Sequence, residues 1–404
     1  MSASRRMAGE SGALLAGSLV NGLAAYGFIA LGTRVLGADA FAPVAIIWVF
    51  WAFSAALLTF PIQHWVIRQM ALDGHSGGVR AARGRVVLLA AAVALAEGLV
   101  ALAARHSLFG DGSWVWPVCV VGVAAGAGFM GLLRGALAGA ERYHAAAVAV
   151  GGENVLRLAA GVALLAIARD PRLLAAALLA GPTVAVLWPG IWRLDPVRGP
   201  RPATGLVGAA GASVLLSQVA LNGGPPLLAA LGGEQAEVTA LFAALALFRA
   251  PYLVALGLTV RATAPLTRRV AAQGSKSLRR PALALAVSGV ALAAGAFGGA
   301  WPLGPPLIRA LFGPATAPSG PIAGTIAAGC VLALGGLGLT VMLIVAGARA
   351  ALVSSWAAAV AAGGLLLGLV GGLEPTARVA VAFVGAEVVA VGAATAALVV
   401  SRRH

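Results

Sequence analysis

Five charged residues stand near the middle of long apolar runs, where an ionised side chain is costly. They are Glu97, Glu153, Arg157, Arg249 and Glu387. Such groups usually face a water-filled cavity or pair with one another. The chemistry they offer is therefore binding of a charged cargo, coupling to a cation, or ion pairing that holds helices together.

Glu153 and Arg157 are four residues apart, so they share one face of a predicted helix, and Asn154 lies beside them. Two interpretations remain open for this group: a structural ion pair, or a cavity site. Glu97 and Glu387 are isolated in their own runs, and structural pairing is the favoured interpretation for both. The alternative is that Glu97, Glu153 and Glu387 couple transport to an ion.

Arg249 has no acid at helical spacing within its own run, and it precedes Pro251, which frees backbone carbonyls. We expect its guanidinium to face a central cavity. Arg34 falls at the end of the first apolar run, where an arginine commonly reaches the membrane surface.

A predicted break interrupts the seventh apolar run. Gln218 and Asn222 are four residues apart and are followed by two glycines, Pro225 and Pro226. Two consecutive prolines remove two backbone donors, so the helix should bend or break there. The break serves either helix packing or a flexible gate, and Pro225, Pro226 and Pro251 are the hinge candidates.

The elements that must position these residues are membrane-spanning helices. Hydrophobic residues make up 60% of the 404 residues and charged residues 10%, against about 25% charged in soluble proteins. Mean hydropathy is +0.96. The sequence thus predicts an all-α polytopic membrane protein. The net charge of +15 is explained by basic loops between apolar runs, not by nucleic-acid binding.

Twelve runs reach the ~20 residues that a spanning helix needs. The predicted spans are 12–34, 41–62, 86–104, 114–136, 145–167, 173–192, 205–231, 238–260, 281–301, 321–345, 351–372 and 378–400. The polar stretch 193–204 (RLDPVRGPRPAT) is predicted to be a cytoplasmic linker between two six-helix lobes, 1–192 and 205–404.

Basic residues set the predicted orientation. With both termini in the cytoplasm, twenty of the 28 basic residues fall in inner segments and six in outer ones. The positive-inside rule favours this topology. The outer segment 302–320 is rich in turn residues and is expected to be a short interfacial loop.

No motif for catalysis or a cofactor is present. The sequence contains no GxxxxGK[ST], no HExxH and no metal-spaced His/Cys cluster, and its two cysteines, Cys119 and Cys330, lie in apolar runs. We therefore expect neither an enzyme nor a bound metal or cofactor.

Three segments resemble a known family. TRVLGADAFAP (33–43), LLRGALAGAERYHAAAVAVGGENVLRL (132–158) and PPLIRALFG (305–313) are similar to segments of bacterial polysaccharide flippases. These belong to the multidrug/oligosaccharidyl-lipid/polysaccharide exporter superfamily. The resemblance implies two six-helix lobes around a central cavity and alternating access.

The resemblance also implies a cargo. Family members move polyprenyl-diphosphate-linked oligosaccharides across the bacterial cytoplasmic membrane for cell-surface polysaccharide biosynthesis. Arg34, Arg157 and Arg249 match helices where the family keeps cavity arginines, and arginine suits a diphosphate. Asn154, Gln218 and Asn222 are further cargo-binding candidates. The implied partners are membrane lipids and polysaccharide assembly enzymes, and the chain is expected to be monomeric.

Three other functions stay open. The first is a cation-coupled exporter of drugs or small metabolites, although the first predicted helix has no acid where such relatives keep one. The second is a membrane glycosyltransferase or polymerase, which is disfavoured because Asp39, Asp111 and Asp170 are isolated in short loops. The third is a scaffold for polysaccharide assembly that transports nothing.

Overall fold

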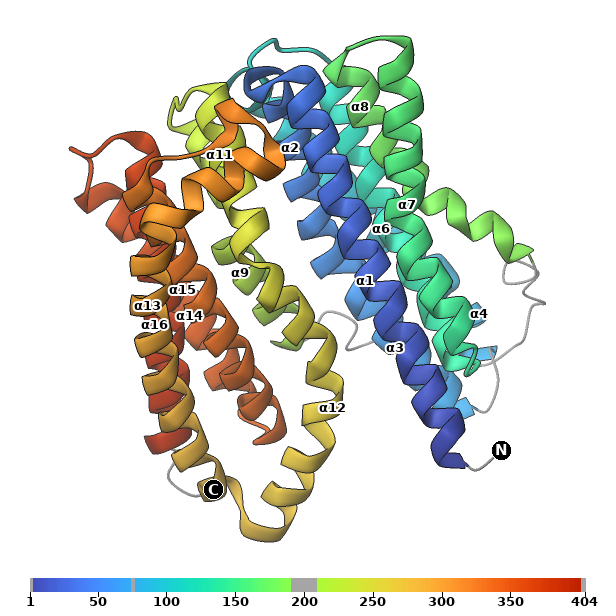
Figure 1. Ribbon diagram of the computed structural model, residues 1–404. Helices are drawn as coiled ribbons and strands as arrows, with labels where there is room; N and C mark the ends of the chain where they lie inside the picture. The colour runs from blue at the N-terminus through green and yellow to red at the C-terminus, as the bar shows by residue number, and fades with distance from the viewer. Residues whose placement is uncertain (1–2, 74–76, 190–208, 401–404) are drawn as a thin grey trace. The chain divides into compact units, whose positions relative to one another are not determined.

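The twelve predicted spans are present as helical segments in the computed structural model, which describes residues 3–73, 77–189 and 209–400 (Figure 1). Within those residues, nine segments are long and apolar enough to cross a membrane, and three shorter apolar helices make up the twelve. No strand occurs in the described residues. The chain is an all-α, multi-pass membrane protein.

The chain divides into two compact units, Met1–Gly211 and Ala212–His404. The whole of the predicted linker 193–204, with its flanks, lies outside the described residues. Its role as a connection between two lobes therefore stays a prediction.

The first unit is a bundle of helices in which α1 lies along α7 and α6 packs against α2, α3 and α4 (Figure 1). Its elements are α1 (Ala3–Leu36), α2 (Ala38–Ser54), the π-helical η1 (Ala55–Thr59), α3 (Phe60–Asp73), α4 (Gly77–Ala103), α5 (Arg105–Phe109), α6 (Val115–Gly139), α7 (Tyr143–Ile167), α8 (Pro171–Ala177) and the 3₁₀ segment η2 (Leu178–Leu187).

Glycines set how closely these helices approach, because hydrocarbon gives helices no hydrophobic reason to associate and close packing must supply the attraction. A Cβ at Gly17 of α1 would stand 2.5 Å from the Ala147 carbonyl oxygen of α7. A Cβ at Gly131 of α6 would stand 2.9 Å from the Thr59 carbonyl oxygen. Both positions require the absence of a side chain.

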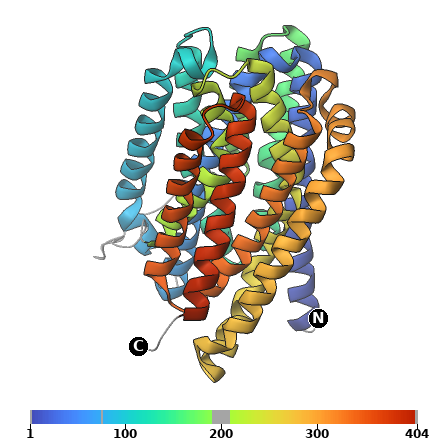
Figure 2. The ribbon, with the colours of Figure 1, turned by 90° about the vertical axis from the view of Figure 1, so that its left-hand side faces the viewer.

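The second unit packs α13 against α14 and α15 against α16, with α14 also contacting α12 and α16 (Figure 2). Its elements are α9 (Ala209–Asn222), which begins just before the boundary, α10 (Gly224–Ala230), α11 (Gln235–Phe248), α12 (Ala250–Gln273), η4 (Ser275–Leu278), α13 (Arg279–Phe312), η5 (Pro314–Thr316), α14 (Gly320–Val345), α15 (Arg349–Leu369) and α16 (Pro375–Val400).

Both units keep large apolar side chains on their outside as well as in their cores. Leu23, Leu88 and Val287 are each about 70% exposed. An exposed apolar surface of this kind suits contact with lipid, where it costs nothing.

The hinge candidate Pro251 lies at an interruption of the eighth predicted span, where Arg249 joins α11 to α12 with ψ near 0° and Pro251 occupies the first turn of α12. One sequence expectation about these helices was wrong. The segment 302–320 is mostly helix, since α13 runs through its prolines to Phe312. Arg309 in the last turn favours that helix end, and Gly313 at φ 109° terminates it.

Candidate functional site

The buried charges of the first unit form one network centred on Arg157, whose side chain is almost entirely buried. Its Nη2 donates to Glu153 Oε1 over 2.6 Å, and its Nη1 donates to Asn154 Oδ1 over 2.8 Å. Its Nε donates to the Leu178 carbonyl over 3.0 Å. All three guanidinium nitrogens are therefore bonded within the first unit.

Three further residues complete this network. Arg134 of α6 donates to Glu153 Oε2, and the Arg157 guanidinium lies 4.5 Å from the centre of the Trp51 ring. Gly181 makes room, because a Cβ there would stand 2.6 Å from Arg157 Nε. Two arginines and one glutamate leave this buried cluster with a net charge of +1.

The sequence did not predict Arg134, Trp51 or Gly181 as members of this group. Arg134 and Glu153 are 19 residues apart on different helices. Such pairs follow from helix packing, which spacing alone does not reveal. The Glu153–Arg157 pairing at helical spacing is the part that the sequence signalled.

A second polar group in the first unit joins Glu97 of α4 to Ser54 at the end of α2. The Ser54 hydroxyl lies 2.6 Å from Glu97 Oε2 and 2.8 Å from the Phe50 carbonyl oxygen. Ser54 is fully buried and Glu97 is 9% exposed. Among the described residues, Glu97 Oε1 has no hydrogen-bond partner.

The second unit brings together four of the predicted residues and one new one. Asn222 Nδ2 donates to Gln218 Oε1 over 2.7 Å, and Arg249 Nη1 donates to Asn222 Oδ1. Tyr252, which the sequence did not signal, lies beside Gln218. Glu387 is near enough to act electrostatically on Tyr252.

Glu387 of α16 is the least satisfied of these groups. It is 0% exposed, and neither carboxylate oxygen has a hydrogen-bond partner among the described residues. It lies close to Gly336 of α14, where an added Cβ would stand 3.9 Å from Glu387 Oε2 and 3.8 Å from the Trp356 ring. An ionised carboxylate without a partner is expensive in such a place.

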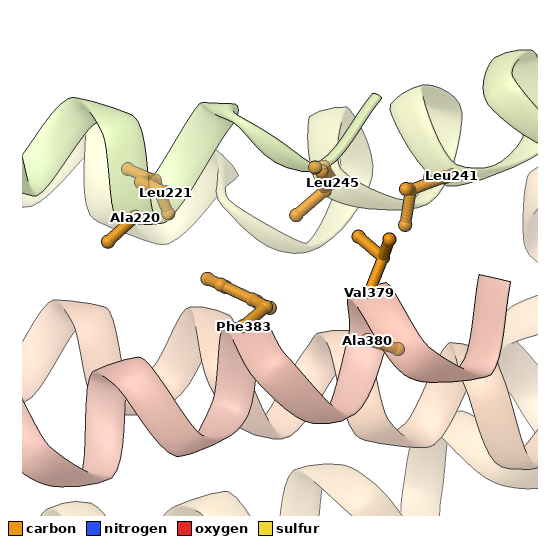
Figure 3. Close-up of a pocket in the computed structure, with 8 residues that line it drawn as sticks. Ala220, Leu221, Leu241, Leu245, Val379, Ala380 and Phe383 are labelled. Atoms are coloured by element: carbon orange, nitrogen blue, oxygen red, sulfur yellow. The ribbon is translucent and has the colours of Figure 1, made fainter. Parts of the chain in front are cut away.

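The predicted break in the seventh span is present. α9 ends at Asn222, α10 begins at Gly224, and Pro225 and Pro226 stand in the first turn of α10. A small apolar pocket lies beside this break, with α9 and α11 on one side and α16 on the other (Figure 3). Its lining residues are Ala220, Leu221, Gly224, Leu241, Leu245, Val379, Ala380 and Phe383. The pocket has no polar side chain, so it offers room for movement and no contact for a polar cargo.

Arg34 lies in the last turn of α1 and is exposed. Its role in cargo binding, like those of Arg157 and Arg249, stays a prediction. No group of three or more His, Cys, Asp or Glu side chains in the described ranges could hold a metal ion.

Asp111, which is isolated in the sequence, ties the α5–α6 turn to α8. Its Oδ2 accepts from Arg172 Nη2 over 2.9 Å, and its Oδ1 accepts from Trp116 Nε1 over 2.6 Å and from the Ser113 backbone. Partial burial alone would raise the pKa of Asp111, but these hydrogen bonds outweigh burial and lower it. Asp111 is thus a structural anchor at the end of the bundle.

Comparison with known proteins gives a match in structure and none in sequence. No protein-family profile and no curated protein matches the chain. The eukaryotic MATE transporter AtDTX14 superposes with a TM-score of 0.62 at 14% identity, over 99% of this chain and 96% of its own. A multidrug resistance MATE family transporter of the MOP superfamily in an inward-facing conformation gives 0.62 at 15%, over 96% of both chains.

The chain has the fold of the MATE transporters. A mutant of the Vibrio cholerae MATE transporter VcmN agrees, with a TM-score of 0.57 at 16% identity over 97% of this chain and 96% of that one. The similarity extends over nearly the whole length of each protein. It therefore concerns the complete twelve-helix plan and not one lobe.

Proposed function

We propose that this chain is a membrane exporter that works by alternating access and exchanges a small organic cargo for protons. The observation that carries the proposal is the state of Glu387, a fully buried carboxylate without a hydrogen-bond partner in the described chain. Glu97 is a second carboxylate of this kind, with one oxygen bonded only to Ser54. Neither forms an ion pair with a described basic residue.

Buried carboxylates suit cation coupling for an energetic reason. A membrane protein that leaves a carboxylate without a basic partner must neutralise it with a proton or a cation. If one conformation opens that carboxylate to water, the bound cation is released there, and its affinity becomes linked to the conformation. A cargo that favours the opposite conformation is then moved against the cation.

The MATE fold supports the same proposal. The matching structures are described as MATE transporters, one of them as a multidrug resistance transporter. A lipophilic organic cation is the corresponding first cargo to test here. The proposal includes a bacterial cytoplasmic membrane location with both termini inside.

The test is efflux from vesicles that contain the purified chain. Vesicles are loaded with ethidium, whose charge does not depend on pH, and the outside is made acidic. We expect efflux faster than in protein-free vesicles and faster than without the gradient. Efflux at one rate with and without the gradient would contradict proton coupling.

Matched variants locate the coupling groups. Replacement of both carboxylates (Glu97→Gln with Glu387→Gln) keeps their size and removes their charge, so the gradient should no longer accelerate efflux. Glu374→Gln is the control, because Glu374 precedes α16 and is exposed. It should behave like the wild type.

A second candidate is the flippase for polyprenyl-diphosphate-linked oligosaccharide that the sequence resemblance implies. The observation in its favour is the net positive charge of the Arg134–Glu153–Arg157 cluster, since a diphosphate entering a membrane protein needs fixed positive charge. Membrane lipids, polysaccharide assembly enzymes and a monomeric state belong to this candidate as well.

The same vesicles distinguish the two candidates. A fluorescent short-chain polyprenyl-diphosphate disaccharide is placed in both leaflets, and the outer label is quenched with a reductant that does not cross the membrane. Complete quenching with the chain present, lost in Arg134→Gln, would favour the flippase. Quenching that stops at about half, together with ethidium efflux, would favour the cation-coupled exporter.

A further inference from the structure

The Ser54 hydroxyl has more acceptors than protons. It lies 2.8 Å from the Phe50 carbonyl oxygen and 2.6 Å from Glu97 Oε2, and both distances are those of a hydrogen bond. A serine hydroxyl carries one proton, so it donates to only one of these oxygens at a time. Both contacts become hydrogen bonds only when Glu97 supplies the second proton.

Two arrangements follow from this proton count. With Glu97 protonated, its Oε2–H donates to Ser54 Oγ, and Ser54 donates to the Phe50 carbonyl. With Glu97 ionised, the Ser54 hydroxyl must turn to the carboxylate, and the Phe50 carbonyl loses the serine bond. One proton added to Glu97 therefore adds one bond from the serine to its own helix backbone.

The backbone affected lies at a helix irregularity. Ser54 is the last residue of α2, and the π-helical segment η1 follows directly, with the Phe60 N–H bonded to the Ala55 carbonyl five residues back. At the other end of η1, the Thr59 hydroxyl donates to the Ala127 carbonyl of α6 over 2.8 Å. A serine bond to the carbonyl four residues back bends or loosens a helix. Here that bond stands immediately before a turn that is already irregular.

Among the described side chains, Glu97 forms no ion pair with the elements packed against α4, which are α2, α3, α5 and α6. Their titratable residues, by position in the sequence, are Asp39, His64, Arg68, Asp73, Arg105, His106, Cys119 and Arg134. Gly98 of α4 packs against Val121 of α6, so Cys119 is the member of this set whose position along the bundle is nearest to that of Glu97. The others stand eight or more residues along the chain from Ser54, Glu97 or Val121.

We propose that Glu97 and Ser54 form a proton-binding site that switches the backbone of the α2–η1 junction. Protonation of Glu97 directs the Ser54 hydroxyl to Phe50 and loosens the junction, and release of the proton frees the Phe50 carbonyl and tightens it. Any role of this site in transport rests on the function proposed above. The site itself is a property of the first unit and can be measured without any cargo.

The test follows protonation and backbone together in the full chain in lipid nanodiscs. Infrared difference spectra across a pH titration report the protonated carboxyl of Glu97, identified as the band missing in Glu97→Gln. Hydrogen exchange of the amides in 50–60, corrected for the intrinsic effect of pH, reports the junction. We expect protection to rise about three- to tenfold as Glu97 loses its proton, because the Phe50 carbonyl is then left to its helix backbone bond alone and that one bond strengthens.

Three variants separate the switch from general damage. Glu97→Gln keeps a donor toward Ser54 at every pH. The junction should therefore stay loose, and the rise in amide protection with pH (the pH step) should vanish. Ser54→Ala removes the link, so the step should vanish while the Glu97 band still titrates. Ser355→Ala is the control, because Ser355 is buried and bonds the Ala351 carbonyl four residues back over 2.7 Å, like Ser54 without a carboxyl. It should keep the full step.

The outcomes separate this site from the proposed function. A wild type without the step, or a step that survives in Glu97→Gln, overturns the site even if proton-driven efflux occurs. A step lost in Glu97→Gln and Ser54→Ala but kept in Ser355→Ala supports the site. That result stands even if the vesicles show no proton-driven efflux, in which case only the proposed function fails.

Discussion

At the scale of single residues, the buried charges of this chain fall into two kinds. Arg157 has each guanidinium nitrogen bonded, to a carboxylate, an amide and a carbonyl. Glu387 has neither oxygen bonded to a described residue. A matched charge holds its surroundings in place, whereas an unmatched one must bind a proton or cation, so the two kinds should respond differently to substitution.

Arg157→Met is expected to destabilise the first unit strongly. It leaves Glu153 with Arg134 alone and removes the donors to Asn154 and Leu178, and removing one partner of a buried pair costs about 3–5 kcal/mol. The measurement is the apparent melting temperature of the detergent-solubilised protein. Arg172→Met, which removes an exposed arginine, is the control and should change it little. Equal melting temperatures for both variants would show that the Arg157 network is not structural.

Asp111 gives a prediction about pH. Because hydrogen bonds lower its pKa in the folded protein, its stabilising effect is present above the ordinary aspartate pKa and is lost as pH falls through the lowered value. Asp111→Asn should therefore lower the melting temperature slightly at neutral pH, and the difference should shrink on acidification. The effect is small because the Arg172 pair is exposed and screened by solvent. A difference that grows on acidification would contradict this assignment.

At the scale of helices, close approach depends on glycines of α6. A methyl group at Gly131 would meet the Thr59 carbonyl oxygen at 2.9 Å and Ile62 Cβ at 3.0 Å. Gly131→Ala should therefore force η1 and α3 away from α6, at a cost of about 1–3 kcal/mol in unfolding free energy. Gly392→Ala on α16 is the control, since nothing lies within 4 Å of its added Cβ. Unfolding of both variants in a denaturant titration measures the difference, and an unchanged Gly131→Ala would contradict this packing.

The break between α9 and α10 tests the gate hypothesis. Pro225 and Pro226 have no N–H to donate to the Leu221 and Asn222 carbonyls, so the span lacks two backbone hydrogen bonds. Replacing both prolines by alanine should restore those bonds and stiffen the span. If the break is a gate, efflux should slow while the melting temperature holds or rises. Efflux at the wild-type rate would contradict the gate hypothesis and leave helix packing as the role of the prolines.

Sequence patterns predicted the helices well and the contacts between them poorly. Every span was predicted because a run of ~20 apolar residues is typical of a membrane-spanning helix. Pro225 and Pro226 predicted the break between α9 and α10, because the absence of their backbone N–H donors is a local property of the sequence. The pairs Arg134–Glu153 and Ser54–Glu97 were not predicted, because each depends on which helices become neighbours.

At the scale of the whole molecule, the fold and the sequence resemblance point to different relatives. The fold matches MATE transporters over nearly the full length. The resemblance of TRVLGADAFAP (33–43) and the segment 132–158 is to polysaccharide flippases. The two proposed functions differ in their cargo and in their driving force. In the first of them, the buried carboxylates of both units take up the cation that drives transport.

The most direct test of cation exchange runs the transporter backwards. Vesicles containing the chain and a trapped pH indicator are given an outward gradient of ethidium without any pH difference. The proposed exchange predicts that ethidium leaving the vesicle draws protons in, so the interior acidifies, and that Glu97→Gln with Glu387→Gln abolishes this signal. Ethidium that leaves through the wild-type chain while the internal pH stays constant would contradict proton exchange.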